Sequence, residues 1–173
     1  MKLLFTSKRQ TDLDLSLSTL YRKAYRAIIY QNKKLLMIKS QKFGEVKFPG
    51  GGKNKGEKAF DVLKREVLEE TGCLIKTKIT PFGETLEYAK DYENVFDLFK
   101  QKSLYYICKI HNKRFSLALS DYEVEYGYEP IWISIEEAIE INMNVLSNDY
   151  IPWKERETLV LEMLLEMRDL IEN

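Results

Sequence analysis

Cysteine, histidine and long apolar runs are all scarce in this sequence. Its 173 residues include two cysteines and one histidine. Two cysteines are too few for a disulfide framework and lack the paired spacing of a structural zinc site, so we expect a reducing, cytoplasmic setting. No apolar stretch approaches the roughly 18 to 20 residues that cross a bilayer, and the short apolar N-terminus soon meets Lys8 and Arg9. We therefore expect neither membrane insertion nor secretion.

The formal net charge is zero, because 27 Lys and Arg residues balance 27 Asp and Glu residues. This balance argues against a uniformly basic nucleic-acid-binding protein, and 45% hydrophobic residues argue against a disordered chain. The charges are nevertheless uneven, since residues 1–56 hold 13 basic and three acidic residues. The unevenness is either a chance distribution over a solvated surface or a basic part that holds an anionic ligand beside acidic residues that hold divalent cations.

Turn residues divide the chain into predicted elements. Gln31-Asn32 separates two apolar segments, which predicts a hairpin of residues 22–30 and 33–39. Residues 57–70 are strong helix formers, and Gly72 after them is a signal for the end of a helix. Together with the remaining elements, the pattern predicts an α+β fold with a largely antiparallel sheet. Those elements are strands at 73–79, 82–88, 103–110 and 130–133 and a helix at 134–141.

The length indicates one domain, because about 150 residues per domain is typical. We expect a single domain over residues 1–173, with an N-terminal extension at 1–20 and a C-terminal helix at 153–172. One apolar stripe on that helix predicts packing on the core, with a partner or dimer surface as the alternative. The stripe consists of Trp153, Val160, Leu164, Met167 and Ile171.

Three glutamates gather on the helix predicted at 57–70. At 100° per residue, Glu66, Glu69 and Glu70 share an arc of about 100°. Like charges at this spacing repel, so the helix on its own gains nothing from them. A divalent cation would reverse the sign, and carboxylates without a nearby His or Cys favour Mg²⁺ or Mn²⁺ over zinc. The alternative is a solvated acidic face.

The spacing around these glutamates resembles a known signature. Reading along the chain gives Gly51, five residues, Glu57, seven residues and then REVLEETGC at residues 65–73. This matches the signature of the Nudix hydrolases, G-x5-E-x7-R-E-U-x-E-E-x-G-U with U a bulky apolar residue, at every fixed position. The one mild departure is Cys73, a smaller residue, at the last apolar position.

The flanking segments are similar to the same family. Residues 48–52, FPGGG, precede the box, and Trp132 is followed by SIEE at residues 134–137. Residues 121–128 and 153–157 look similar to a group of small bacterial, MutT-like Nudix proteins whose substrates are largely unassigned. The resemblance therefore extends beyond the 23 residues of the box.

The resemblance implies a Nudix α/β/α sandwich, in which a mixed sheet is flanked by helices and the box forms a loop, a helix and a loop. It implies hydrolysis of a pyrophosphate bond in a nucleoside diphosphate linked to another moiety, with Mg²⁺, or Mn²⁺, as the cofactor. Nucleoside triphosphates, nucleotide sugars and dinucleoside polyphosphates all fit. The alternatives are a catalytically silent nucleotide-binding sensor or regulator and a small scaffold protein.

The resemblance also implies partners. The expected partner is a small molecule derived from a nucleotide, and a homodimer is compatible with it. RNA ends and other nucleic acids are less expected, because no extended basic surface with interleaved aromatic residues is apparent.

Carried over position by position, the signature assigns roles. Glu66, Glu69 and Glu70 become metal ligands, and Glu66 or Glu69 also deprotonates or orients the attacking water. Arg65 and Glu57 are expected to pair and to hold the loop against the helix.

Two further kinds of metal ligand follow from the resemblance. A main-chain carbonyl of Gly50 or Gly51 is the expected ligand from the loop, where the backbone must approach metal and phosphate closely. A further carboxylate from outside the box is expected among Glu123, Glu125 and Glu129, and we prefer Glu125. The alternative is that these three are ordinary loop acids.

Substrate contacts are expected from basic residues near the loop. Arg26, Lys39, Lys47 and Lys53 are the candidates for binding phosphate. Each of them singly could instead be a solvated side chain. His111, the sole histidine, would carry any histidine chemistry alone and is not expected to do so.

Overall fold

The computed structural model describes residues 1–91, 95–145 and 151–172. Within them no helix is long and apolar enough to cross a membrane. The elements, in chain order, are β1 (Leu3–Lys8), β2 (Thr19–Ile28), β3 (Tyr30–Gln31), β4 (Lys34–Ser40), β5 (Val46–Lys47), α1 (Ala59–Thr71), β6 (Cys73–Lys90), β7 (Leu98–Arg114), α2 (Asp121–Glu125), β8 (Tyr128–Ile133), α3 (Ile135–Asn144), α4 (Lys154–Glu166) and α5 (Asp169–Glu172).

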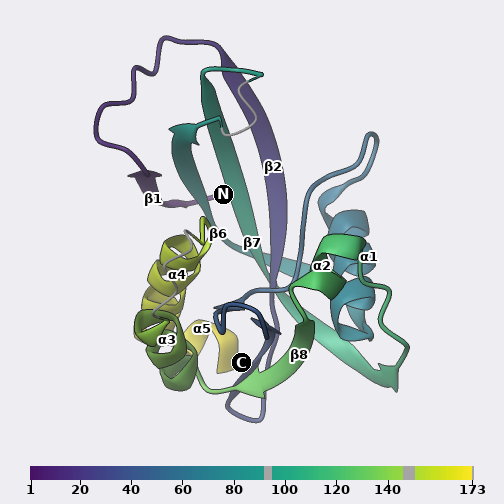
Figure 1. The fold of residues 1–173 in the computed structure, drawn as a ribbon. Helices are drawn as coiled ribbons and strands as arrows, with labels where there is room; N and C mark the ends of the chain where they lie inside the picture. The colour runs from purple at the N-terminus through teal and green to yellow at the C-terminus, as the bar shows by residue number, and fades with distance from the viewer. Residues whose placement is uncertain (92–94, 146–150, 173) are drawn as a thin grey trace.

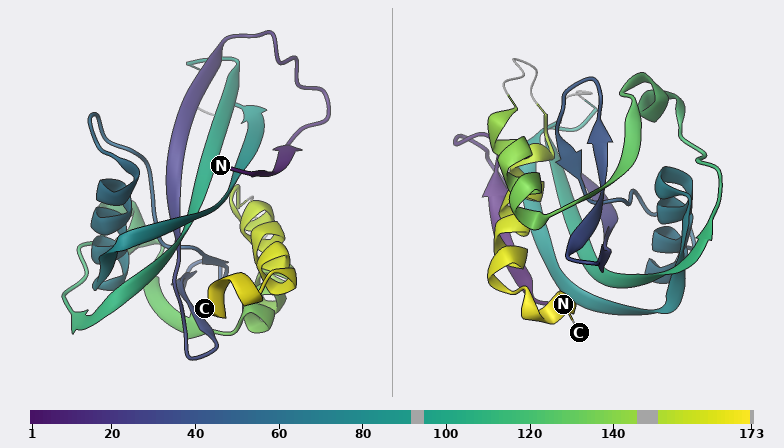
Figure 2. Two further views of the ribbon diagram at one scale, coloured as in Figure 1. Left: turned by 180° about the vertical axis from the view of Figure 1, so that it is seen from behind. Right: turned by 90° about the horizontal axis from the view of Figure 1, so that it is seen from below.

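The strands form two sheets between two groups of helices. One sheet has the order β1-β6-β7-β2, and the other has β3-β4-β5 with β8 paired to β4. The first sheet is mixed, because β6 and β7 are antiparallel whereas β1 and β2 run parallel to their neighbours. In Figures 1 and 2, α1 and α2 lie on one side of the strands, and α3, α4 and α5 lie on the other. This is the mixed sheet flanked by helices that the resemblance implied.

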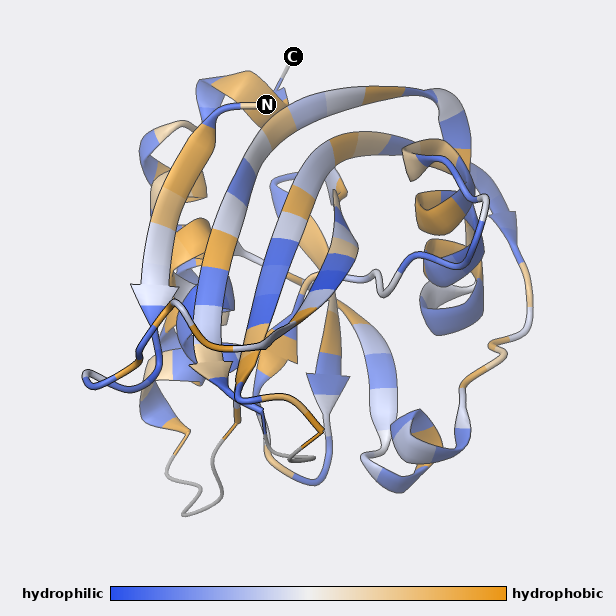
Figure 3. Cartoon of the chain, turned by 90° about the horizontal axis from the view of Figure 1, so that it is seen from above, coloured by the Kyte–Doolittle hydropathy of each residue, from blue (hydrophilic) through white to orange (hydrophobic). Residues whose placement is uncertain are grey.

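Apolar residues pack on both faces of the strands. Bands of hydrophobic and hydrophilic residues alternate along β6 and β7, as a strand with two faces requires (Figure 3). One buried cluster lies beneath α1 and includes Val62, Leu63 and Val67. The other joins the strands to α3, α4 and α5, and the apolar stripe of the C-terminal helix contributes Val160, Leu164 and Ile171 to it. The stripe is therefore core packing, as predicted.

The helix of the signature ends where its sequence indicates. Gly72 follows α1 with φ of 66°, and its N–H donates to the carbonyl of Leu68 at 2.9 Å. A side chain at Gly72 would collide with the carbonyl of Phe115, so only glycine fits this left-handed position.

Several elements differ from the sequence prediction. The predicted hairpin of residues 22–30 with 33–39 is wrong for most of its length, because β2 pairs in parallel with β7 and only the short β3 pairs with β4. β6 is one strand rather than two, since it continues through Pro81 with an irregular register between Pro81 and Gly83. The predicted C-terminal helix is interrupted after Glu166 and resumes as α5. The segment expected as an N-terminal extension contributes β1 to the sheet, and the short helix α2 was not predicted. The prediction of a largely antiparallel sheet is wrong for the first sheet, where two of the three pairings are parallel.

Candidate active site

The glycine loop, residues 48–52, is held from both sides by buried charged groups. Its Phe48 N–H donates to Oε2 of Glu157 from α4 at 2.9 Å, and its Gly50 N–H donates to Oε2 of Glu70 from α1 at 2.6 Å. Arg26 on β2 donates to the carbonyls of the same two residues. Two carboxylates and one guanidinium thus satisfy four polar groups of the loop backbone, which fixes the loop between α1 and α4.

The loop also pairs with β2. The Tyr25 N–H donates to the carbonyl of Gly51, and the Ala27 N–H donates to the carbonyl of Pro49, both at 2.9 Å. Gly50 has φ of 136°, and a side chain there would collide with the carbonyl of Tyr25. Glycine is required at position 50 because the backbone of β2 comes so close.

The expected pair of Arg65 and Glu57 is present. Nε of Arg65 lies 2.8 Å from Oε1 of Glu57, and Nη2 lies 3.1 Å from Oε2, so the contact is bidentate. Nη2 also donates to the carbonyl of Gly52 at 3.1 Å. The Arg65 hydrogen bonds, followed by one from the Asn54 N–H, lower the pKa of Glu57 to about 2. The pair therefore ties the loop to the helix.

Acid should remove the stabilisation that this pair gives. The folded-state pKa of Glu57 is depressed to about 2 from an ordinary 4.5, so its contribution is complete above pH 4.5 and is lost as the pH falls toward 2. We expect Glu57→Gln to lower Tm at neutral pH, and the difference from the unsubstituted protein to shrink steadily with acidification. Thermal unfolding followed by circular dichroism across this range tests the expectation, and a difference independent of pH would contradict it.

Glu66 and Glu69 share the same guanidinium. Nη1 of Arg65 lies 2.7 Å from Oε1 of Glu66 and 3.2 Å from Oε2 of Glu69. Burial raises the pKa of Glu66, and its carboxylate lies against the glycine loop, since a side chain at Gly51 would come within 2.5 Å of Cδ of Glu66. Glu69 is more open to solvent. Glu66 and Glu69 therefore both contact one positive group, and Glu66 lies beside a glycine backbone that carries no side chain.

This donor set fits a hard divalent cation. Carboxylate and carbonyl oxygens are the ligands that Mg²⁺ and Mn²⁺ prefer. Across residues 1–91, 95–145 and 151–172, no three His, Cys, Asp or Glu side chains are already gathered for metal binding. A cation held by Glu66 and Glu69 would thus also draw on main-chain oxygens of the glycine loop.

Glu70 on the same helix is buried, and both of its carboxylate oxygens are engaged. It is 1% exposed and lies 2.9 Å from Nζ of Lys47, while its second oxygen accepts the Gly50 N–H. Lys47 is itself buried, with Nζ 4.2 Å from the ring centre of Tyr128. In this structure Glu70 therefore braces the loop, and its role as a metal ligand stays a prediction.

The four expected phosphate-binding residues lie in different surroundings. Lys47 and Arg26 are buried and engaged by Glu70 and the loop carbonyls. Lys39 is half-buried on β4, and Lys53 is exposed just after the loop. Lys53 thus faces solvent and Lys39 is partly covered, whereas Lys47 contacts Glu70 and Arg26 contacts the loop carbonyls.

The three candidate acids outside the box separate clearly. Glu125 is exposed, with 64% of its side chain accessible, and pairs with Lys42 at 2.6 Å. Glu129 accepts a hydrogen bond from Gln41 on the surface. Glu123, on α2, is buried.

Glu123 accepts hydrogen bonds from its own helix start. The N–H and the hydroxyl of Ser120 donate to its Oε2 at 2.8 and 2.7 Å. Burial alone would raise the pKa of Glu123, but these hydrogen bonds and the charge of Lys47 lower it. The charge of Glu123 thus interacts with that of Lys47, which in turn pairs with Glu70.

Three further residues lie at the site and were not predicted from the sequence: Glu157 and Arg156 on α4, and Arg22 on β2. Arg156 is buried and pairs with Glu157 at 2.7 Å and with Glu87. A side chain at Gly52 would come 3.4 Å from Nη2 of Arg22, so Arg22 lies directly beside the loop. The one sequence signal for Arg156 and Glu157 was the similarity of residues 153–157 to other Nudix proteins. It did not indicate where these side chains point.

A family model describes most of this chain. The model of the NUDIX domain matches residues 20–154, from the start of β2 to the start of α4. The chain belongs to the Nudix family. Family membership indicates pyrophosphate hydrolysis in general, and it confirms the resemblance and the fold class expected from the sequence. The glycine loop and α1 lie within the matched range, whereas β1 and most of α4 lie outside it.

Solved structures with this Nudix fold come from several bacteria. A NUDIX hydrolase from Nitrosomonas europaea has a TM-score of 0.59, with 17% identity over 87% of this chain and 90% of that one. The E. coli ORF135 protein has a TM-score of 0.56, with 17% identity over 86% and 91%. A MutT NUDIX hydrolase from Burkholderia pseudomallei has a TM-score of 0.54, with 17% identity over 83% and 97%. This likeness shows the fold alone, and no curated protein matches the sequence.

Proposed function

We propose that this Nudix protein hydrolyses a pyrophosphate bond in a nucleotide, with Mg²⁺, or Mn²⁺, as its cofactor. The observation that carries the proposal is that Glu66 and Glu69 share one Arg65 guanidinium directly beside the glycine loop. When bound, the ion would polarise phosphate oxygens and neutralise the charge that develops in the transition state.

The side chains of the site would bind the ion, accept a proton and position the ligands. Glu66 and Glu69 would supply hard oxygen ligands, and one of them would accept the proton of the attacking water. Arg65 orients both carboxylates, and Glu57 holds Arg65 against Gly52. Arg65 and Glu57 act by positioning, because their contacts are with the carboxylates and the loop.

The loop carbonyls and Glu70 complete the proposed ligand set. The carbonyl of Gly50 accepts from Arg26 and that of Gly51 accepts from Tyr25, and each has a second lone pair for a cation. Glu70 would contribute through lone pairs that Lys47 and Gly50 leave unused.

We infer that Glu123, rather than Glu125, is the acid from outside the box that serves this site. Burial of Glu123 and its coupling to Lys47 support this choice, whereas Glu125 is paired with Lys42 at the surface. Lys53, which is exposed just after the loop, and Lys39, which is half-buried on β4, remain proposed phosphate contacts.

A hydrolysis screen tests the proposed function. Purified protein is incubated with nucleoside triphosphates, nucleotide sugars and dinucleoside polyphosphates, with Mg²⁺, with Mn²⁺ and with a chelator, and the products are separated by chromatography. We expect turnover of one substrate class with either ion and none with the chelator. The absence of turnover across the whole panel would overturn the proposal, as would turnover that survives chelation.

A further inference from the structure

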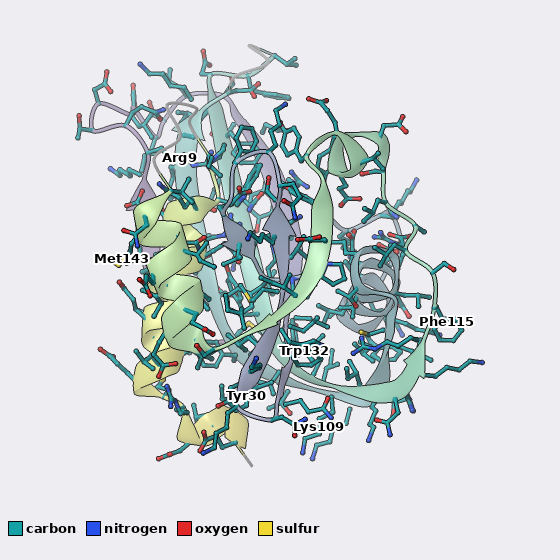
Figure 4. All side chains as sticks on the ribbon, turned by 60° about the horizontal axis from the view of Figure 1, so that its bottom comes forward. Arg9, Tyr30, Lys109, Phe115, Trp132 and Met143 are labelled. Atoms are coloured by element: carbon teal, nitrogen blue, oxygen red, sulfur yellow. The ribbon has the colours of Figure 1, made fainter. Side chains whose placement is uncertain are left out.

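A pocket of about 260 Å³ opens beside the glycine loop, between the sheet and the start of α4. We call it the arginine pocket, because four arginines line it. Figure 4 shows one of them, Arg9, beside α3 and α4 at the opposite end of the molecule from Tyr30 and Lys109. Its lining includes Arg9, Arg22, Arg26 and Arg156, with Phe99 and Trp153 as aromatic walls.

Carboxylates neutralise Arg9 and Arg156 at one end of the pocket. Arg9 lies 3.2 Å from Glu87, and Arg156 pairs with both Glu87 and Glu157. Asp91 also lies on the lining, where its Oδ2 accepts the N–H groups of residues 95 and 96. An anion would gain little at this end.

The surroundings of Arg22 and Arg26 are different. Within the described part of the chain, neither Arg22 nor Arg26 has a carboxylate at ion-pair distance, and Arg26 donates to main-chain carbonyls instead. Desolvation, followed by the charges of Arg26 and Arg156, lowers the pKa of Arg22. Arg22 is exposed, and Arg26 is buried without a carboxylate at ion-pair distance among the described residues. A bound anion would be attracted to both.

Arg26 retains unused hydrogen-bonding capacity. Its Nε is buried and has no hydrogen-bond partner among the residues that the structure describes, and the residue as a whole is 8% exposed. A buried N–H without an acceptor costs free energy. A phosphate oxygen in the pocket would offer an acceptor, and the planar guanidinium groups match phosphate geometry.

Two consecutive glycines connect the pocket to the carboxylates. A side chain at Gly51 would come within 2.5 Å of Cδ of Glu66, and one at Gly52 would come 3.4 Å from Nη2 of Arg22. Since consecutive Cα atoms are about 3.8 Å apart, Glu66 and Arg22 flank neighbouring points of one strip of bare backbone. This segment carries no side chain that would keep a phosphate chain from passing between them.

The size of the pocket limits what can enter it. Its volume of about 260 Å³ lies below the roughly 300–1,000 Å³ of pockets that enclose whole drug-sized ligands. A phosphate group fits within this volume.

Building on the proposed pyrophosphate hydrolysis, we propose that the arginine pocket binds the terminal phosphate of the substrate. The substrate class is then a nucleoside 5′-polyphosphate with a free phosphate end, such as a nucleoside triphosphate. A nucleotide sugar would place an uncharged group against Arg22 and Arg26, and a dinucleoside polyphosphate would place a nucleoside there.

Arg22→Gln tests this assignment with two substrates in parallel. We expect kcat/KM for a nucleoside triphosphate to fall about 10- to 100-fold, the value of one charge-assisted hydrogen bond. Any turnover of a nucleotide sugar should be slower than that of the triphosphate and hardly altered by the substitution. Arg22→Lys should recover part of the loss, and Lys23→Gln, an exposed neighbour outside the pocket lining, serves as the matched control.

The outcomes separate this inference from the proposed function. Preferred turnover of a nucleotide sugar or a dinucleoside polyphosphate, or an equal effect of Arg22→Gln on all substrates, would overturn the inference and leave hydrolysis standing. If no substrate is turned over, the proposed function fails, and calorimetric titration with inorganic pyrophosphate without metal decides the pocket. Binding that Arg22→Gln weakens supports an anion site, whereas absent or unaltered binding overturns it.

Discussion

Replacement of Glu66 or Glu69 by glutamine is expected to lower kcat by about 10²- to 10⁴-fold, the usual value of a group that moves a proton in the transition state. Glutamine keeps the shape of the side chain but removes the negative charge that would hold a cation and accept the proton of water. Both residues share Nη1 of Arg65, so each substitution leaves one partner of that guanidinium in place. Initial rates with the substrate found by the screen measure the effect.

The control for this experiment is Glu162→Gln, which makes the same chemical change at an exposed position of α4. Its kcat should equal that of the unsubstituted protein, and all three variants should retain near-native Tm. An unchanged kcat in Glu66→Gln and in Glu69→Gln would remove both carboxylates from the proposed chemistry. A loss in one variant alone would remove the other carboxylate from the proposed chemistry.

Arg156→Met is expected to have the largest effect on stability. The Arg156 side chain is 2% exposed and pairs with Glu157, which is completely buried and holds the Phe48 N–H of the glycine loop. Removing one partner of a buried ion pair leaves an uncompensated charge and costs about 3–5 kcal/mol. We expect the free energy of unfolding in urea to fall by this amount, and activity to fall with it because Glu157 then loses its fixed orientation.

A second variant separates loss of the pair from simple loss of packing. Arg156→Met combined with Glu157→Gln removes the stranded charge, so it should be more stable than Arg156→Met alone. Arg168→Met breaks an exposed contact with Glu136 and should leave unfolding nearly unchanged. If the double variant is no more stable than Arg156→Met, the ion pair is not the source of the loss.

The local elements were predictable because local residues determine them. α1 stops at Gly72 in a left-handed conformation, as the sequence indicates. A hairpin is present close to the predicted Gln31-Asn32, but it turns at Asn32 and Lys33 and joins β4 only to the two-residue β3. The continuous strand β6 was not predictable in the same way. Pro81 is an ordinary breaker in sequence, and only the pairing of β6 with both β1 and β7 carries the strand past it.

The site shows the same division. The spacing from Gly51 to Gly72 places Glu57, Arg65 and the glutamates of α1 by helical geometry alone, and the expected Arg65–Glu57 pair is present. Which way each glutamate faces depended on its neighbours. Lys47 from β5 draws Glu70 inward, a contact between residues 23 positions apart that no local pattern contains.

Sequence by itself determined the family, the helix that carries the carboxylates and the loop that must be glycine, because a fixed spacing and the absence of side chains are properties of the chain. Only the tertiary structure decided which charges meet. It buried Lys47 and Arg26 behind the loop, turned Glu125 to the surface and Glu123 inward, and brought Arg156 and Glu157 from the C-terminal helix to the site. The physical reason is that burial and ion pairing depend on packing between elements distant in sequence, and long charged side chains follow the partner that the fold supplies.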